Sequence, residues 1–540
     1  MAEITGHRLV ARALKNDGVE ALFFLMGGPI SQLVGESEKL GIKTYYVRHE
    51  QAAAMAAHAY ARITGKTGVC VTTAGPGTIN AATGVANALA DAAPLICLGG
   101  SSAMNLTTIG GFQEMDQVPV MRGMTKLTLK AELTYRIPEY ISVAMRHAQD
   151  GCKGSVYVDL PGDILGGVVD ESKVLFPERY RVQSRPLGNP ADIRKAVDLL
   201  AKAQRPLLVT GSGILWSEAW DELRQLVEST GIPFYTTPQG RGAIPEDHRL
   251  FFGGARSTAF KEADVVLVVG TRANSMLFNL RAPRFSADAK FIEVNIDGTE
   301  LGRNRPVDVG IQGDAKMVLQ QLMEEAKGRF KGAKESPWAQ RLKAVDAANA
   351  DRTEHETGSD KLPIHPARLC KEVREVMDRD GVLVDDGHEL MGFSRHTVPS
   401  YHPRHRITAG PHGVMGVGVP FGIGAQVGAP SKQVIVLSGD GAFGWNGMEM
   451  DTAVRHKLPI KVVIGNNAGF TSRSTYGSVG RELGWLRYDK MMEAIGCHAE
   501  WVEEPDKIKA ALKRALAAPG PAVVNVRTDP EARAVSRVGF

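Results

Sequence analysis

Two neighbouring stretches decide the fold: Val434–Gly441 (VIVLSGDG) and, further along, Ile460–Asn467 (IKVVIGNN). Each is an apolar run of strand length that ends in glycine and polar residues, which is typical of a buried parallel strand and the turn after it. If the two strands pair, Asp440 and Asn467 lie side by side at the carboxyl edge, where α/β sheets bind ligands. A carboxylate, an amide oxygen and a nearby carbonyl are hard donors that suit Mg²⁺ or Ca²⁺.

The segment between the two stretches is predicted to be a helix, with Met448, Met450, Ala453 and Val454 on one side. Free backbone amides at the start of a helix attract phosphate groups, so this helix start is expected to bind a diphosphate. The alternative reading is a pair of ordinary strand-to-helix turns with polar tips.

Length and composition indicate an ordinary globular protein of several domains. The chain has 540 residues, of which 43% are hydrophobic and 23% charged, and a net charge of +4. So small a charge argues against a nucleic-acid binder, and no apolar run is long enough to span a bilayer. The five cysteines are scattered without a CxxC pair, and the N-terminus lacks a signal-like pattern. We therefore expect a cytoplasmic protein without zinc or disulfides.

Strand-like runs alternate with helix-like segments in three blocks. The runs lie at 22–25, 44–47, 69–72, 95–98 and 156–159, then at 206–210, 233–236, 265–269 and 291–296, and finally at 382–384, 434–437, 460–464 and 522–526. This alternation predicts parallel sheets with helices on both faces. We predict an α/β fold of three doubly wound parallel-sheet domains, at residues 1–168, 190–330 and 362–540.

Gly-Asp-Gly at 439–441, followed after 24 residues by Asn-Asn at 466–467, resembles the signature of thiamine diphosphate (ThDP) enzymes. The resemblance implies a pyrimidine-binding, a central and a diphosphate-binding domain, in that order. It also implies ThDP anchored through Mg²⁺, which would be held by Asp440, Asn467 and the carbonyl of Gly469. Further cofactor contacts are implied for Gly387, His388, Gly413, Gly439, Gly441 and Ala442.

Glu50 stands where a strand-like run gives way to the alanine-rich segment 51–63. Taken alone, it is an acid that the macrodipole favours in the first turn of a helix. In the resembled family a carboxyl group at this place exchanges a proton with the aminopyrimidine ring of the cofactor, so the resemblance assigns that role to Glu50. In that family this carboxyl group and the Gly-Asp-Gly segment come from different subunits. We therefore expect a homodimer or homotetramer with the site at the subunit interface.

Met415 lies in the glycine-rich segment 412–420 (HGVMGVGVP). The plain reading is a methionine that packs in a core. The resemblance implies instead that Met415 wedges under the cofactor and bends it.

Further motifs are similar to the acetolactate synthase branch, which includes 2-hydroxyacyl-CoA lyases and oxalyl-CoA decarboxylases. They are RHEQ at 48–51, TAGPG at 73–77, GGSS at 99–102 and FQEMDQ at 112–117. FAD-binding members carry Arg-Phe-Asp-Asp-Arg after a central strand, whereas this chain has GTRANS at 270–275, so FAD is not expected. The resemblance leaves ADP in the central domain open.

The same branch suggests residues for the substrate. Phe112 and Gln113 are implied to face the reacting carbon, and Gly28 replaces an isoleucine typical of acyl-CoA members, which would enlarge the space above the thiazolium ring. Arginine binds phosphate well, so CoA phosphates are assigned to basic residues. These are Arg256, Arg272 and Arg537. The alternative for each arginine is a solvent-exposed side chain without a ligand.

The favoured prediction is a ThDP- and Mg²⁺-dependent lyase or carboligase. It cleaves a 2-hydroxyacyl-CoA to an aldehyde or ketone plus formyl-CoA, or runs the reverse reaction. Two departures weaken this choice: acyl-CoA members usually read Gly-Asp-Ser and have a longer tail. An acetolactate synthase-like 2-oxo-acid carboligase or decarboxylase without FAD stays open, as does a protein of this fold that binds its ligand without catalysis.

Overall fold

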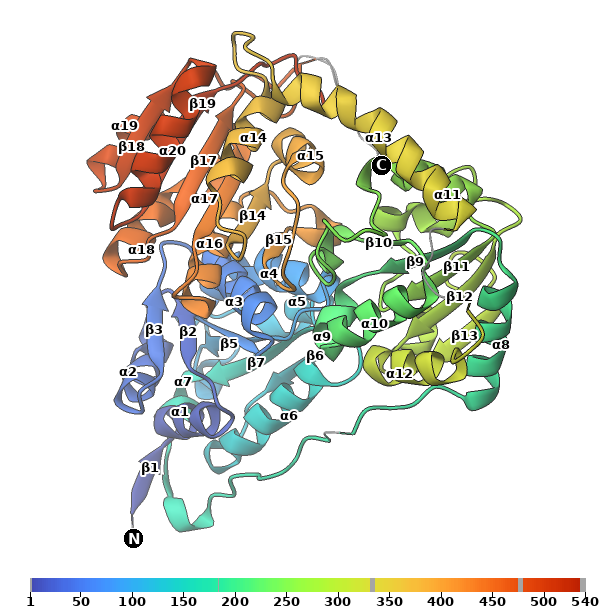
Figure 1. The fold of residues 1–540 in the computed structure, drawn as a ribbon. Helices are drawn as coiled ribbons and strands as arrows, with labels where there is room; N and C mark the ends of the chain where they lie inside the picture. Colours follow the sequence, from blue (N-terminus) through green and yellow to red (C-terminus); the bar gives the residue numbers. More distant parts are fainter. Residues whose placement is uncertain (1, 183, 331–335, 474–478, 535–540) are drawn as a thin grey trace.

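The structure is a computed structural model that describes residues 2–182, 184–330, 336–473 and 479–534, apart from the side chains of 351 and 352. Its elements form three α/β units, each built on a parallel sheet (Figure 1). The predicted three-domain, parallel-sheet fold is confirmed. The domain limits at 1–168, 190–330 and 362–540 stay a prediction.

The N-terminal sheet has six parallel strands in the order β3-β2-β4-β5-β7-β6. Its strands are β2 (Ala21–Phe24), β3 (Lys43–Tyr46), β4 (Gly68–Thr72), β5 (Leu95–Ser101), β6 (Leu127–Lys130) and β7 (Ser155–Pro161). The helices of this unit are α1 (Gly6–Asn16), α2 (Ser31–Lys39), α3 (Glu50–Thr64), α4 (Pro76–Ala90), α5 (Gln117–Arg122), α6 (Ile137–Gln149) and α7 (Gly162–Gly166). The central strands β4, β5 and β7 are buried along their whole length because helices cover both faces of the sheet.

The central sheet has five parallel strands in the order β10-β9-β11-β12-β13. They are β9 (Pro206–Thr210), β10 (Phe234–Thr236), β11 (Val265–Val269), β12 (Lys290–Asn295) and β13 (Val309–Gln312). Its helices are α8 (Pro190–Lys202), α9 (Ser212–Ser217), α10 (Trp220–Thr230), α11 (Arg256–Glu262) and α12 (Ala315–Glu325). This unit has a hydrophobic core of its own. The long helix α13 (Pro337–Thr357) then runs from the central unit to the C-terminal one (Figure 1).

The C-terminal sheet has six parallel strands in the order β15-β14-β16-β17-β19-β18. They are β14 (Val382–Asp386), β15 (Arg406–Thr408), β16 (Val434–Gly439), β17 (Lys461–Asn466), β18 (His498–Val502) and β19 (Ala522–Arg527). Its helices are α14 (Pro366–Val376), α15 (His388–Thr397), α16 (Gly418–Gly428), α17 (Asp440–Asn446), α18 (Met450–Arg455), α19 (Tyr488–Ala494) and α20 (Ile508–Ala517). A short pair of β1 (Glu3–Thr5) and β8 (Val168–Asp170) completes the fold.

The single helix predicted between the two decisive stretches is wrong. Helix α17 ends at Asn446, a 3-10 turn covers Gly447–Glu449, and α18 begins at Met450. The break occurs because Asn446 leaves the helical region (φ −127°, ψ 20°) and donates its side-chain amide to the carbonyl of Gly416, 2.8 Å away. As a result Met448 is 44% exposed, whereas Met450 is buried.

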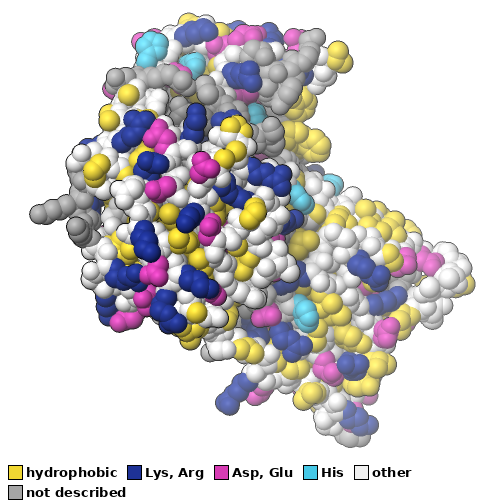
Figure 2. All heavy atoms as spheres, turned by 90° about the vertical axis from the view of Figure 1, so that its right-hand side faces the viewer, with side chains coloured by type: hydrophobic (Ala, Val, Ile, Leu, Met, Phe, Trp, Pro, Cys, Tyr) yellow, Lys and Arg dark blue, Asp and Glu magenta, His cyan; other side chains and the backbone are white. Residues whose placement is uncertain are grey.

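The N- and C-terminal units share one hydrophobic core, and helices α3 and α16 pack against each other inside it. The approach is so close that a Cβ on Gly424 would lie 2.0 Å from the carbonyl oxygen of Ala56. Within the described part of the chain, no helix is long and apolar enough to cross a membrane. Figure 2 shows one face of the molecule, on which basic and acidic side chains are interspersed.

Candidate active site

The two decisive strands are neighbours, as predicted. Strand β16 pairs in parallel with β17, with Gly439 opposite Gly465, so Asp440 and Asn467 follow at the same carboxyl edge. Strand β14 pairs with β16 on the other side and ends at the same edge with Asp386. This edge therefore collects polar residues from three successive strands in the sheet.

Asp440 is 1% exposed and only partly satisfied by the protein. Its Oδ2 accepts a hydrogen bond from the amide of Gly469 at 2.9 Å, while Oδ1 is buried without a hydrogen-bond partner among the described residues. Burial raises the pKa of Asp440 to about 7, although the amides of Gly441 and Gly469 oppose that rise. Because a buried carboxylate oxygen without a partner is costly, Asp440 fits a bound cation.

Asn467 completes a donor set for such a cation. Its Nδ2 donates to the carbonyl of Thr471 at 3.0 Å, which leaves Oδ1 as an acceptor. No group of three or more His, Cys, Asp and Glu side chains in the described ranges is placed to bind a metal. One carboxylate and one amide oxygen, with other oxygens from a ligand or water, suit Mg²⁺. The residues present therefore fit the ion, and its binding here is a proposal.

A cradle of small residues lies beside this pair. Gly387 adopts a left-handed backbone (φ +88°), and a Cβ there would lie 2.9 Å from the amide nitrogen of Gly439. A Cβ on Gly441 would lie 2.6 Å from the ring of Phe470. Ala442 is buried next to Gly387, whereas His388 is exposed at the start of α15. Side chains are excluded where a diphosphate would approach the backbone.

The loop that carries Met415 is fixed on both sides. Gly413 and Gly416 have positive φ values of 58° and 81°. The carbonyl of Gly416 accepts the hydrogen bond from Asn446, and the amide of Gly418 donates to Asp386 at 2.7 Å. Met415 itself is 39% exposed, so the structure does not place it in a core. Its role as a wedge under the cofactor stays a prediction.

In the N-terminal unit, Glu50 is the first residue of α3 and is 5% exposed. Its Oε2 accepts a hydrogen bond from the side-chain amide of Asn80 at 3.1 Å, and a Cβ on Gly77 would lie 3.1 Å from Oε1. The amides of Arg48 and His49 each donate to Oε1 of Glu449 at 3.0 Å, which ties the turn before α3 to the C-terminal unit. The sequence pattern did not predict that Asn80 binds Glu50, or that Glu449 binds the turn before α3.

The Phe112–Gln113 loop lies close to Gly75, in the turn before α4. Phe112 is 87% exposed, and Gln113 has a positive φ of 57°. A Cβ on Gly75 would lie 2.6 Å from the carbonyl oxygen of Gln113, and a Cβ on Gly28 would meet no atom within 4 Å. Open space at Gly28 is what its predicted role requires. Among the interactions of the described residues, none joins Glu50 to Asp440, so the site at a subunit interface stays a proposal.

Comparisons with known proteins identify the family. The thiamine pyrophosphate enzyme N-terminal TPP-binding domain matches residues 4–120, the central domain 193–322, and the C-terminal TPP-binding domain 386–526. The chain belongs to the thiamine pyrophosphate enzyme family. Its fold, its thiamine diphosphate-binding domains and its kinship with carbon–carbon lyases and carboligases thus agree with the sequence prediction.

Three relatives of this thiamine pyrophosphate enzyme span nearly the whole chain. A 2-hydroxyacyl-CoA lyase of Arabidopsis thaliana is 36% identical over 99% of this chain and 97% of its own length. An acetolactate synthase large subunit, IlvG, of Mycobacterium tuberculosis is 34% identical, with coverages of 97% and 95%. An oxalyl-CoA decarboxylase of Escherichia coli K12 is 31% identical, with coverages of 98% and 95%. The relatives thus include enzymes named for acyl-CoA substrates and one that is not.

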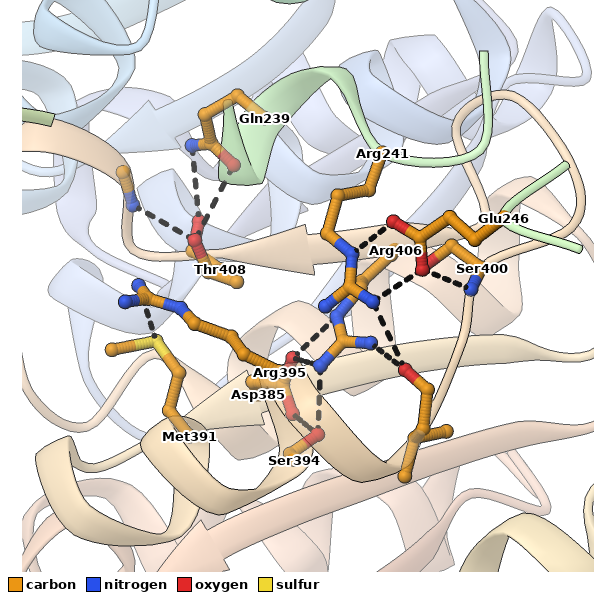
Figure 3. Close-up of polar contacts among 12 residues, drawn as sticks. Gln239, Arg241, Glu246, Asp385, Met391, Ser394, Arg395, Ser400, Arg406 and Thr408 are labelled. Carbon is orange, nitrogen blue, oxygen red and sulfur yellow. Dashed lines mark hydrogen bonds and ion pairs between the residues drawn. The ribbon is translucent and has the colours of Figure 1, made fainter. Parts of the chain in front are cut away.

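This thiamine pyrophosphate enzyme also has a cavity of about 560 Å³ between the central and C-terminal units. Arg256 and Arg395 line it, and neither forms an ion pair with a residue that the structure describes. Burial lowers the pKa of each to about 10, and for Arg256 the positive charge of Arg395 adds to the effect. In the part of the chain that the structure describes, the buried Nε of Arg395 has no hydrogen-bond partner, and a terminal nitrogen donates to the sulfur of Met391 (Figure 3). Sequence reasoning missed Arg395.

A polar network that includes Arg241 and Glu246 of the cavity lining joins the central unit to the C-terminal sheet (Figure 3). Arg241 pairs with Glu246 and donates to the carbonyl of Val398 at 3.1 Å. Arg406 in β15 donates to the same carbonyl and pairs with Asp385 at 2.8 Å. Since Asp385 is in the strand that ends at Asp386, the central unit supports the edge on which the cofactor cradle is built.

A second cavity of about 370 Å³ lies at the carboxyl ends of the central strands. Arg272 lines it and donates to the carbonyl of Ala90. The structure therefore separates Arg272 from Arg256, which lines the first cavity. The third predicted phosphate ligand, Arg537, lies outside the described residues.

Proposed function

We propose that the chain is a ThDP- and Mg²⁺-dependent enzyme that cleaves a 2-hydroxyacyl-CoA to an aldehyde or ketone plus formyl-CoA, or joins these products. One observation carries the choice of substrate: the partly exposed guanidinium groups of Arg256 and Arg395 line one cavity, and neither forms an ion pair with a carboxylate among the described residues. Charge left unpaired in this way suits an anionic ligand such as the phosphates of CoA.

The reaction requires the bond between the thioester carbon and the hydroxyl-bearing carbon to break. The hydroxyl loses its proton as the carbonyl forms, and the thioester carbon gains a proton. When bound, ThDP supplies the carbon centre that accepts electrons during this cleavage. Glu50 would hold and release the proton at the aminopyrimidine ring, with its carboxylate oriented by Asn80. Gln113 would donate a hydrogen bond to the substrate oxygen.

The remaining residues position the reactants. Asp440, Asn467 and the carbonyl of Gly469 would hold Mg²⁺, and the small residues around Gly387 would admit the diphosphate. The open space at Gly28 would admit the acyl group. If the central-sheet cavity binds a nucleotide, ADP is the proposed ligand, and FAD is not proposed. We place the enzyme in the cytoplasm, as a homodimer or homotetramer with the site between subunits.

The test of substrate class uses one acyl group in two forms, the CoA thioester and the pantetheine thioester that lacks the nucleotide. Replacing Arg256 or Arg395 by Met should raise KM for the CoA thioester by about 10- to 100-fold, because a charged hydrogen bond contributes about 1.5–3 kcal/mol. KM for the pantetheine thioester should stay unchanged. Arg379→Met is the matched control, because Arg379 pairs with Asp247 away from the cavity.

An equal KM change for both thioesters would contradict phosphate recognition. If the wild-type enzyme converts pyruvate and ignores both thioesters, the acetolactate synthase-like function without FAD takes the place of the lyase. The 34% identity to an acetolactate synthase supports that second candidate function.

A further inference from the structure

Glu389, the second residue of α15, holds two segments that are far apart in the sequence. It is buried, and its Oε1 accepts hydrogen bonds from the hydroxyl of Thr471 at 3.0 Å and from the amide of Ser472 at 3.4 Å. Its Oε2 accepts a hydrogen bond from the amide of Ala534 at 2.8 Å. One carboxylate thus joins the loop after β17 to the C-terminal segment.

The loop after β17 carries the proposed cation ligands. The carbonyl of Thr471 accepts the hydrogen bond that orients the amide of Asn467, and it thereby leaves the oxygen of Asn467 for the cation. Ala468 and Thr471 both have φ values of 60°, a left-handed conformation that costs residues with a side chain on the order of 1 kcal/mol. A loop strained in this way needs anchors outside itself, and Glu389 is a direct anchor of Thr471.

The C-terminal segment forms part of the arginine-lined cavity. The segment lies alongside the same loop, because Ser472 donates its hydroxyl to the carbonyl of Glu531 at 3.2 Å. Ala534 lines the cavity together with Gly392 of α15. It also packs closely on that helix, since a Cβ on Gly392 would lie 2.5 Å from the Cβ of Ala534. The position of Ala534 on the cavity wall therefore depends on α15 and on Glu389.

We propose that Glu389 is a positioning residue that couples the Asn467–Thr471 cation loop to the Ala534 wall of the arginine-lined cavity. This inference rests on the proposed function, which places Mg²⁺ and ThDP at the loop and CoA in the cavity. When the loop is fixed by the cation and cofactor, Glu389 is held where the amide of Ala534 can bind it. Coupling of this kind is reciprocal, so each ligand tightens the other by the same factor.

The first experiment measures hydrogen exchange of the backbone amides of residues 531–534, with and without ThDP and Mg²⁺. In the wild-type protein, ThDP and Mg²⁺ should slow exchange at Ala534. Glu389→Gln should abolish that response, because one carboxylate oxygen becomes an NH₂ group. That group cannot accept the hydrogen bond that Thr471 and Ser472, or Ala534, donate to Glu389. This measurement does not involve CoA, so it stands even if the proposed substrate is wrong.

The second experiment measures the affinity for ThDP by calorimetry, at saturating Mg²⁺, with and without free CoA. CoA should tighten ThDP binding by at least about 5-fold in the wild type, and Glu389→Gln should reduce that factor to about 1. Gly392→Ala is the matched control: it pushes Ala534 away without touching Thr471. It should weaken CoA binding and leave ThDP affinity in the absence of CoA unchanged.

Thr471→Val removes the hydroxyl that Glu389 binds and keeps the shape of the side chain, so it tests the same link if Glu389→Gln fails to fold. It should also abolish the response of Ala534. The proposal is overturned if Ala534 exchanges equally fast with and without ThDP and Mg²⁺ in the wild type, or if Glu389→Gln and Thr471→Val respond as the wild type does. Failure of CoA to bind, with the Ala534 response intact, overturns only the choice of substrate.

Discussion

Asp440→Asn is predicted to stabilise the apoenzyme and to remove its response to the cofactor. Burial raises the pKa of Asp440 from the ordinary 3.8 to about 7, so the ionised carboxylate disfavours the folded chain. The stability that depends on this group is fully present below pH 3.8 and is lost as the pH rises through about 7. The gap between the two pKa values corresponds to about 4 kcal/mol, which sets the upper limit of the effect.

Because asparagine stays neutral, apo Asp440→Asn should be more stable than wild type at about pH 8 by up to about 4 kcal/mol, and by much less near pH 4. Urea denaturation of the protein, freed of metal and cofactor by a chelator, measures this difference. The matched control is Asp489→Asn. For Asp489, burial opposes ionisation, but the hydrogen bonds and charge of Arg487 and the hydrogen bond from Asn525 together lower its pKa, so that substitution should destabilise the apoenzyme.

Adding Mg²⁺ and ThDP should then narrow the difference in stability between the two proteins. Ligands at about 100 times their Kd stabilise the wild type by about 2.7 kcal/mol, whereas Asp440→Asn should gain little because a cation donor is lost. If apo Asp440→Asn is no more stable than wild type at about pH 8, burial does not disfavour the ionised carboxylate. If the variant keeps the full gain from Mg²⁺ and ThDP, Asp440 is not a ligand of the cation.

Three further predictions follow from single residues. Glu50→Gln should lower kcat by about 10²- to 10⁴-fold while calorimetry shows ThDP still bound, and an unchanged kcat would contradict proton transfer by Glu50. Gly424→Ala should lower the urea midpoint by the equivalent of about 1–3 kcal/mol, because its Cβ would collide with Ala56 of α3. The collision should outweigh the helix propensity of alanine, which exceeds that of glycine by about 1 kcal/mol. A raised midpoint would contradict the close packing of the two helices. Burial raises the pKa of Asp386 to about 6. As the pH rises from about 4 to 6 and above, the wild-type apoenzyme should therefore lose up to about 3 kcal/mol of stability, whereas Asp386→Asn should not show this loss. Parallel profiles of stability against pH for the two proteins would refute this prediction.

The sequence predicted the strands that are buried on both faces, because they read as uninterrupted apolar runs. It missed the outer strands β6 and β18, which lie at the edges of their sheets and carry polar residues. It also missed β15, where Arg406 is buried through its ion pair with Asp385. That partner is 21 residues away in the chain, so a local pattern gives no sign of it.

Site residues divide in the same way. Asp440 and Asn467 follow directly from strand ends, so their neighbourhood could be predicted from spacing alone. Arg395 and Glu389 lie within or at the start of a helix among ordinary polar residues, and only the folded chain shows what surrounds them. Their roles depend on contacts between segments that are distant in the sequence, which neither periodicity nor spacing encodes.

Helix α15 links the cofactor cradle to the arginine-lined cavity, and its length bears on the size of the substrate. Its first residue, His388, follows the cofactor cradle, and Arg395 projects into the cavity seven residues later. At 1.5 Å per residue, these positions are about 10 Å apart along the helix. A 2-oxo acid would be held entirely at the cradle and would leave Arg256 and Arg395 unused. A CoA thioester has a reacting carbon and phosphates joined by a long flexible arm, so it can engage both ends of α15 at once. The cost of partly burying two guanidinium groups that pair with no described carboxylate is then offset by substrate binding, which is why the geometry favours the acyl-CoA reaction over the 2-oxo-acid alternative.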